Sequence, residues 1–268
     1  MPTTQLLAKN IRCNALKMVH RAKASHIASA LSIIDVLAVL YGQVMHFDAD
    51  NEHLVTRDRF ILSKGHACVA VYSTLAEVGI IENEQLTTYG DDFSWLMNHI
   101  SHKVPGVEFS TGSLGHGLPF GVGKALAAKA RGQSWRTYVL LSDGEMDEGS
   151  NWEAMMFSAH HKLTHLVAII DYNKLQSLDS IANTLGLEPM VDKLTAFGWA
   201  VHEIDGHDHQ QIANALITLH QDKPSVIIAH TIKGKGVSFM ENKVEWHYKN
   251  PNDEQLERAL AELELMNA

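Results

Sequence analysis

The stretch Thr137–Asn173, TYVLLSDGEMDEGSNWEAMMFSAHHKLTHLVAIIDYN, indicates the fold class of this 268-residue chain. Short aliphatic runs, 137–141 and 165–170, stand at its two ends, and the segment 148–160 between them reads as a helix. Strand, helix and strand in this order form a parallel βαβ unit. Neither run alternates between apolar and polar residues, which is typical of strands buried on both faces of a sheet.

The alternation of strands and helices continues toward the C-terminus. Apolar runs at 199–204 and 225–229 are each preceded by a helical segment, 188–197 and 210–220. The first third of the chain is mainly helical, with expected helices near 6–19, 29–41 and 67–78 and a short apolar run at 59–62. We predict an α/β fold, a parallel sheet flanked by helices on both faces, in a single domain over residues 1–268.

Composition and charge exclude several classes of protein. With 46% hydrophobic and 20% charged residues the chain is an ordinary globular protein, and its net charge of −9 argues against general nucleic-acid binding. The most apolar stretch, 31–40, is too short for a membrane span, and the N-terminus has no apolar signal core. Two cysteines, Cys13 and Cys68, make no disulfide scaffold and have no metal-type spacing, so we expect a cytoplasmic protein.

Polar residues follow both strands of the opening stretch. Ser142–Gly144 comes directly after the first strand and Asp171–Asn173 after the second. Ligands of parallel sheets bind at the carboxyl ends of the strands, so neighbouring strands would bring Asp143 and Asn173 to one edge. A carboxylate and an amide oxygen suit Mg²⁺ or Ca²⁺, although each residue alone is also common in turns.

Glycines and histidines are two further concentrations. The glycines precede a helix and let a backbone approach a flat or anionic ligand, although tight helix packing explains them equally well. They match neither a Rossmann fingerprint nor a P-loop. The pair His161 and His165 lacks the glutamate of a zinc motif, so we expect no zinc site there. The residues of interest are Gly112, Gly115, Gly117, Gly121 and Gly123, with His26, His66, His99, His102 and His247 among 17 histidines.

Taken in order, these segments resemble the thiamine-diphosphate-binding half of transketolase. A lone Asp-Gly and Asn pair would be weak, whereas the whole set in this order is specific. The resemblance implies thiamine diphosphate as cofactor, together with Mg²⁺ or Ca²⁺. The matching blocks run from about residue 20 to 251: ASHIASALSIIDVLAVLY, RDRFILSKGHACVAVYSTL, HISHKVPGVEFSTGSLGHGLPFGVGKALA, SDGEMDEGSNWEA, IIDYNKLQ and WHYKNP.

The resemblance also implies roles for single residues. Asp143, Asn173 and the backbone carbonyl of Leu175 would hold the divalent ion, and Gly144 would lie beside the diphosphate. The thiazolium ring is the electron sink that cleavage of a ketose requires, and histidines suit the accompanying proton transfers near neutral pH. Gly112, Ser113 and Leu114 would lie along the aminopyrimidine, and Glu148 would lie near the site at the subunit contact. The implied active-site histidines are His26, His66, His99 and His247, of which His66 and His247 would also touch the cofactor.

Four positions depart from the family's usual residues. Ser142 replaces the first glycine of Gly-Asp-Gly, His116 stands where glutamine is common, and Ala28 and Tyr248 stand where glycine is common. They lie near the expected substrate channel. The resemblance therefore implies the cofactor more strongly than the identity of the sugar.

The family's second domain has no counterpart after His247, where the acidic tail is a predicted amphipathic helix. That domain supplies a glutamate to the aminopyrimidine and arginines to the sugar phosphate. We therefore expect the N-terminal subunit of a split transketolase, which transfers a two-carbon ketol unit between a ketose and an aldose, both as phosphates. Its partner would carry the pyrimidine-binding and C-terminal domains, two copies of each chain forming a heterotetramer.

Two alternatives stay open at this point. One is another thiamine-diphosphate enzyme subunit, of the deoxyxylulose-phosphate synthase or dehydrogenase type. The other is a paralogue that binds a partner without catalysis. The histidine set and the EGSNWEA block favour transketolase over the first, and Asp143, Asn173 and Glu148 favour catalysis over the second.

Overall fold

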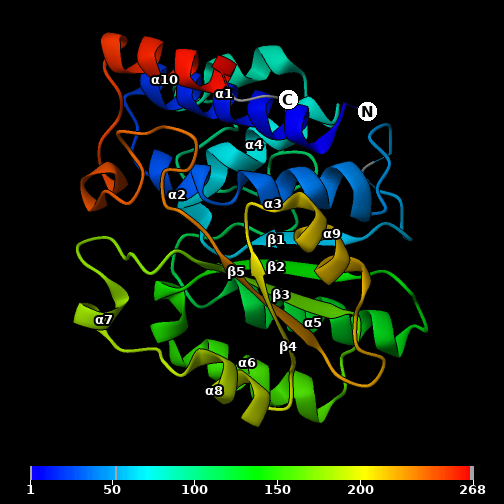
Figure 1. Cartoon of the computed structure of the whole chain (residues 1–268). Helices are drawn as coiled ribbons and strands as arrows, with labels where there is room; N and C mark the ends of the chain where they lie inside the picture. The colour runs from blue at the N-terminus through cyan, green and yellow to red at the C-terminus, as the bar shows by residue number, and fades with distance from the viewer. Residues whose placement is uncertain (1, 52, 266–268) are drawn as a thin grey trace.

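The apolar runs of the sequence form one parallel sheet. In the computed structural model, which describes residues 2–51 and 53–265, the strand order is β1-β2-β3-β5-β4 and each neighbouring pair is parallel (Figure 1). The predicted α/β fold is therefore confirmed. The strands are β1 (Arg59–Leu62), β2 (Thr137–Ser142), β3 (Leu166–Tyr172), β4 (Ala200–Asp205) and β5 (Ser225–His230).

Helices cover both faces of this sheet (Figure 1). On one face lie α5 (Gly117–Ala130), α6 (Gly149–His160) and α8 (Met190–Ala196), while α7 (Ile181–Thr184) lies in the connection after β3. The other face is covered by α2 (Ile27–Leu31), α3 (Ile34–Val39), α4 (Cys68–Glu77) and α9 (His209–Ile217), with α1 (Thr4–Ala22) and α10 (Asp253–Leu265) outside them.

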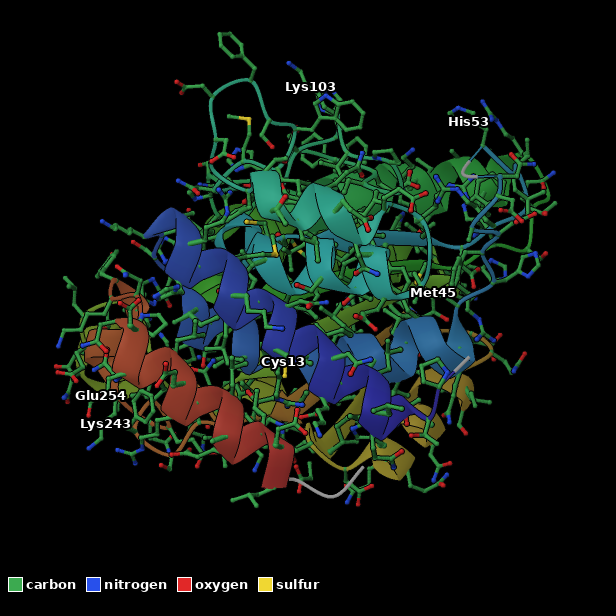
Figure 2. The ribbon with its side chains drawn as sticks, turned by 90° about the horizontal axis from the view of Figure 1, so that it is seen from above. Cys13, Met45, His53, Lys103, Lys243 and Glu254 are labelled. Carbon is green, nitrogen blue, oxygen red and sulfur yellow. The ribbon has the colours of Figure 1, made fainter. Side chains whose placement is uncertain are left out.

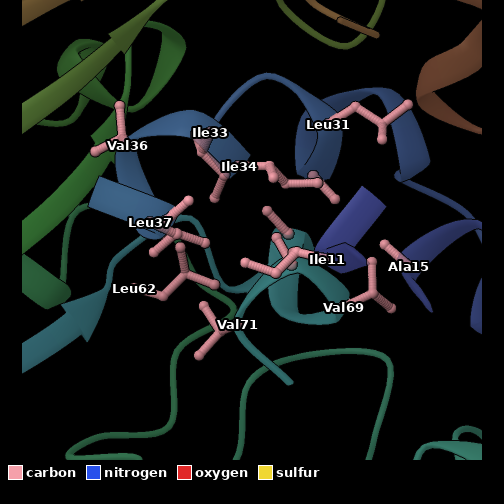
Figure 3. Close-up of a cluster of buried hydrophobic side chains, with 14 of the residues drawn as sticks. Ile11, Ala15, Leu31, Ile33, Ile34, Val36, Leu37, Leu62, Val69 and Val71 are labelled. Atoms are coloured by element: carbon pink, nitrogen blue, oxygen red, sulfur yellow. The ribbon is translucent and has the colours of Figure 1, made fainter. Parts of the chain in front are cut away.

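The core has two halves, one on each face of the sheet. Along β2, Tyr138 and Leu140 belong to one buried cluster, and Val139 and Leu141 belong to the other. Figure 3 shows part of the first cluster, in which Ile11 of α1 lies among side chains of α3 and α4. Burial of both faces is the reason that the strand sequences do not alternate with polar residues.

The predicted helix at 29–41 is wrong in one respect, because the structure breaks it into α2 and α3. The break lies at Ser32, whose Oγ donates to Oδ2 of Asp171 (2.6 Å) and lies 3.0 Å from the carbonyl oxygen of Ser29. The local pattern of apolar residues gives no sign of the contact between Ser32 and Asp171, because Asp171 lies at the end of a strand far along the chain. The short run at 59–62 is the edge strand β1.

The acidic tail forms α10 and packs alongside α1 (Figure 2). Ala259 and Leu263 are its buried residues, and Glu264 accepts a hydrogen bond from Lys9 at 2.7 Å. The predicted amphipathic helix is therefore confirmed. Among the helices within 2–51 and 53–265, none has the length and apolar character needed to cross a membrane.

Two glycines of α5 provide a matched test of packing against the sheet. A Cβ on Gly121 would lie 2.4 Å from Cγ2 of Val139 in β2, whereas a Cβ on Gly123 would meet nothing within 4 Å. We expect Gly121→Ala to lower the free energy of unfolding by about 1–3 kcal/mol through overpacking. We expect Gly123→Ala to raise it by about 0.5–1 kcal/mol, because alanine is the better helix former. Urea unfolding of both variants measures the difference, and equal effects would contradict this account.

Candidate functional site

The carboxyl ends of β2 and β3 are neighbours, as predicted. Ser142 is in register with Asp171, which brings Asp143 and Asn173 to the same sheet edge. A cavity of about 270 Å³ opens there. Of the predicted site residues, those lining it are His26, His66, His99, Gly112, Leu114, Asp143, Gly144, Asn173, Leu175 and His247.

Two predicted residues lie outside the cavity lining. Ser113 and Glu148 are exposed, and Glu148 precedes the first residue of α6. A Cβ on Gly115 would lie 2.6 Å from Cβ of Glu148, so this acidic residue adjoins the glycine-rich loop. Its expected role at a subunit contact stays a prediction.

Asp143 is a buried carboxylate at the floor of the cavity. Its Oδ1 accepts from the backbone N–H of Gly144 (2.7 Å), and its Oδ2 accepts from that of Lys174 (2.6 Å). Burial, together with the nearby charge of Asp171, raises the pKa of Asp143 to about 7. A cation bound at this carboxylate would favour its ionised form and so lower the pKa again.

Asn173 and Leu175 present two more oxygens. Oδ1 of Asn173 accepts from the N–H of Leu175 (3.0 Å), and its amide nitrogen donates to Asp171 (3.0 Å), which orients the side chain. The carbonyl of Leu175 accepts from Nζ of Lys233 at 2.9 Å. Each of these oxygens has a second lone pair, so a hard cation would find carboxylate, amide and carbonyl donors together.

These donors fit Mg²⁺ or Ca²⁺ better than a softer metal. Within the described parts of the chain, no three His, Cys, Asp or Glu side chains are grouped so that they could hold a metal ion. The set at this edge contains one carboxylate and two neutral oxygens, so water and phosphate oxygens of a ligand would have to complete the coordination. The site therefore suits a metal that arrives with a diphosphate.

Two buried lysines, which the sequence reasoning missed, add positive charge to the cavity. Lys64 and Lys233 both line it and are almost completely buried. Nζ of Lys64 donates to Oδ2 of Asp171 at 2.6 Å. Burial and the proximity of Lys64 lower the pKa of Lys233 to about 8. An anionic group fits this environment, and the only sequence signals were lysines in SKGH and IKGKG.

Asp171, a third residue that the sequence reasoning missed, connects the groups at the base of the cavity. Besides Lys64 and Asn173 it accepts from the hydroxyls of Ser32 and Thr231. Burial would raise its pKa, but Lys64 and the hydroxyl donors outweigh burial and lower it. Asp171 therefore remains ionised while Asp143 beside it is driven toward the neutral form.

The predicted histidines gather above this floor. The ring centroid of His26 lies 5.0 Å from that of His66, 6.1 Å from His99 and 4.9 Å from His247. His26 has a left-handed backbone (φ 72°) at the start of α2, and its N–H donates to the carbonyl of His247 at 2.8 Å. The four residues come from four separate segments, which explains why spacing alone does not reveal the cluster.

Burial keeps three of these imidazoles neutral. It lowers the pKa of His26 to about 4 and that of His247 to about 3, with nearby positive groups as the second cause, and it lowers the pKa of His66 well below its usual value. A neutral imidazole can both donate and accept a proton. Nδ1 of His26 is buried without a hydrogen-bond partner among the described residues.

The glycine-rich stretch serves both packing and the cavity. A Cβ on Gly117 would lie 2.3 Å from Oγ of Ser63, so close packing requires glycine there, whereas Gly112 lines the cavity. Glu145, a further buried residue that the sequence reasoning missed, accepts from Ser63 Oγ and from the N–H of Gly115 (2.8 Å). It thereby fixes this loop against the ends of β1 and β2.

The four departures from the family's residues differ in their placement. Ser142 lines the cavity, and its Oγ accepts from the N–H of Glu145 at 3.2 Å. Tyr248 also lines the cavity, with its ring 5.7 Å from that of His26. His116 is exposed and Ala28 is buried, and neither is among the lining residues.

The sequence model for the "Transketolase, thiamine diphosphate binding domain" matches residues 3–263. The chain is 43% identical, over 97% of its length, to one of the subunits of the apulose-4-phosphate transketolase of Phocaeicola vulgatus and covers 94% of that protein. It is 41% identical to a 6-deoxy-6-sulfo-D-fructose transketolase subunit of a Clostridium species, covering 96% of this chain and 94% of the relative.

Solved structures agree with these matches. Transketolase from Campylobacter jejuni superposes with a TM-score of 0.93 at 29% identity, over 98% of this chain and 43% of the longer one. The chain thus spans less than half of a full-length transketolase but nearly all of the two relatives named as subunits. The chain belongs to the transketolase family, and it corresponds to the family's thiamine diphosphate-binding domain.

Proposed function

We propose that the chain is the N-terminal subunit of a split transketolase and uses thiamine diphosphate with Mg²⁺ or Ca²⁺. The observation that carries this proposal is the cavity in which the oxygen donors of Asp143, Asn173 and Leu175 lie below four clustered histidines. The reaction is transfer of a two-carbon ketol unit from a ketose phosphate to an aldose phosphate.

The residues of the cavity divide into two groups. Asp143, Asn173 and the Leu175 carbonyl would hold the metal ion, and Lys64 and Lys233 would compensate the diphosphate charge. Gly112, Ser113 and Leu114 would border the aminopyrimidine, Gly144 would lie beside the diphosphate, and His66 and His247 would touch the cofactor. When bound, thiamine diphosphate supplies the electron sink for cleavage beside a ketose carbonyl.

The histidines would handle the substrate. His26, His66, His99 and His247 lie within reach of one ligand, and imidazoles can hydrogen-bond a ketose carbonyl and move protons of its hydroxyls. Tyr248 lines the same cavity. Which sugar is bound would depend on this upper part of the cavity.

The partner would be a second chain with the pyrimidine-binding and C-terminal domains, in a heterotetramer, and Glu148 would face it. Support comes from relatives that are named as subunits and that this chain covers to 87–94% of their length. We also propose that the chain is a single cytoplasmic domain over 1–268, consistent with the free thiols of Cys13 and Cys68.

Cofactor binding tests the first part of the proposal. Asp143→Asn keeps the shape of the side chain but removes its charge from the metal site. We expect the affinity for thiamine diphosphate, measured by calorimetric titration in Mg²⁺ with the second chain present, to fall about 100-fold or more. Asp179→Asn, an exposed carboxylate outside the cavity lining, is the matched control and should bind like the wild type. Unchanged affinity in the Asp143 variant would overturn the metal assignment.

The depressed histidine pKa values predict a dependence of stability on pH. Between about pH 6.5, where an unfolded histidine titrates, and pH 4, the unfolded chain binds more protons than the folded chain at His26 and His247. Their contribution to stability is therefore present above pH 6.5 and lost as the pH falls toward 4.

When the pH is lowered from 7 to 5, the free energy of unfolding should decrease less in His247→Asn than in the wild type. Urea unfolding at the two pH values measures this difference. His102→Asn is the control, because this exposed histidine lies outside the cavity lining and should leave the pH dependence unchanged. The raised pKa of Asp143 changes the unfolding free energy with pH in the opposite direction. Because Asp143 is present in all three proteins, the comparison between them isolates the effect of His247. Parallel curves for the wild type and the His247 variant would contradict the prediction.

The partner proposal predicts that the purified chain is inactive alone. With thiamine diphosphate, Mg²⁺ and a ketose–aldose phosphate pair, we expect no two-carbon transfer until the second chain is added. The expected reason is that half of the cofactor site comes from the partner and that an open site admits water. Chromatographic detection of the new ketose measures the transfer, and full activity of the chain alone would refute the split-enzyme proposal.

A further inference from the structure

The segment after β5 carries Lys233 into the cavity and is held by several hydrogen bonds, among them that of the Asn242 N–H to the carbonyl of Lys233 at 2.9 Å. The hydroxyl of Thr231 donates to Asp171, and the N–H of Gly234 donates to the carbonyl of Ala28 at 3.0 Å. Between them, the N–H of Ile232 donates to Nε2 of His207 at 2.8 Å. Nζ of Lys233 then reaches the carbonyls of Leu175 and Gln176, both at 2.9 Å.

His207 is outside the cavity lining and follows β4. Because its Nε2 accepts from a backbone N–H, its ring proton is assigned to Nδ1, which donates to Oδ2 of Asp35 at 2.7 Å. The adjoining Gly206 allows this close approach, since a Cβ there would lie 2.4 Å from Cγ2 of Thr231. The ring therefore bridges α3 and the segment that holds Lys233.

Asp35 is a fixed acceptor for this ring. It is buried, and the guanidinium of Arg12 donates to both of its oxygens, at 3.0 and 2.6 Å. Burial would raise its pKa, but Arg12 and the two histidine donors outweigh burial and hold the pKa well below the usual value. The carboxylate thus stays ionised and keeps the Nδ1 proton of His207 in place.

We propose that His207 is a positioning residue of the cofactor cavity: through the Ile232 amide it fixes the segment that places the Lys233 ammonium beside Leu175 and Gln176. The inference rests on the proposed function, because it concerns binding of the diphosphate in that cavity. The series Arg12, Asp35, His207 and Ile232 connects α1 and α3 to a charge in the site without touching the ligand itself.

The neighbouring His209 provides a matched control. Its Nε2 lies 3.1 Å from Oδ1 of the same Asp35, and its Nδ1 lies 2.8 Å from Oγ1 of Thr4. Both histidines therefore contact the same carboxylate, but only His207 also accepts from the segment after β5. Loss of either ring removes a partner of Asp35, so a merely structural effect would appear in both variants.

The test compares His207→Ala, His207→Gln and His209→Ala, each with the second chain present, by calorimetric titration with thiamine diphosphate in Mg²⁺. Urea unfolding of each variant without the cofactor gives its stability. We expect His207→Ala to weaken binding about tenfold, which corresponds to about 1.4 kcal/mol. His207→Gln should restore most of this loss, because its amide oxygen can accept from Ile232. His209→Ala should bind like the wild type.

Coupling to Lys233 makes the test specific. In a Lys233→Met background, His207→Ala should cause little further loss of affinity, because the ammonium that it positions is gone. Three results would each overturn the inference and leave the proposed function intact. The first is an equal loss of affinity in His207→Ala and His209→Ala, and the second is wild-type affinity of His207→Ala. The third is that His207→Gln fails to restore binding although it unfolds at the same urea concentration as the wild type. Absence of binding by the wild type in the presence of the second chain would overturn both.

Discussion

The buried ion pair between Lys64 and Asp171 is the interaction on which the rest of the site depends. An unpaired charge at this depth would cost several kcal/mol, so the carboxylate must collect donors to remain ionised. It does so from the segments after β1 and β5, from its own strand end and, through Ser32, from the break between α2 and α3. The same carboxylate therefore contacts the helix break, orients Asn173 and anchors the segment of Lys233.

The fold was predictable because a sheet buried on both faces requires strands that are continuous runs of apolar residues, and such runs are visible in the sequence. Apolar runs such as 165–170 lie within one or two residues of the observed strands, and the order of strands and helices implies parallel pairing. The helix at 29–41 was mispredicted for a reason that local periodicity does not contain. Ser32 bonds to a strand end far along the chain, and only tertiary structure makes that contact visible.

The candidate site was predictable where its chemistry lies in motifs, as with Asp143, Asn173 and the histidines that line the cavity. It was not predictable where burial gives an ordinary residue its role. Lys64 and Glu145 have no spacing that distinguishes them from surface charges, and their importance follows from the absence of water around them. The resemblance to a family compensated for part of this gap, because it identified histidines that come from separate segments.

The carboxylates of Asp143 and Asp171 lie close together and repel each other when both are ionised. Asp171 stays ionised through Lys64, and its charge helps to raise the pKa of Asp143 to about 7. Because this value lies above that of an unfolded aspartate, an ionised Asp143 destabilises the fold, and the stabilising contribution of its protonated form is lost as the pH rises through about 7. A divalent cation bound at Asp143 would remove this penalty by favouring the ionised form. Because it would have to displace the proton of Asp143, its apparent affinity would increase as the pH rises through about 7, and its binding would stabilise the folded chain.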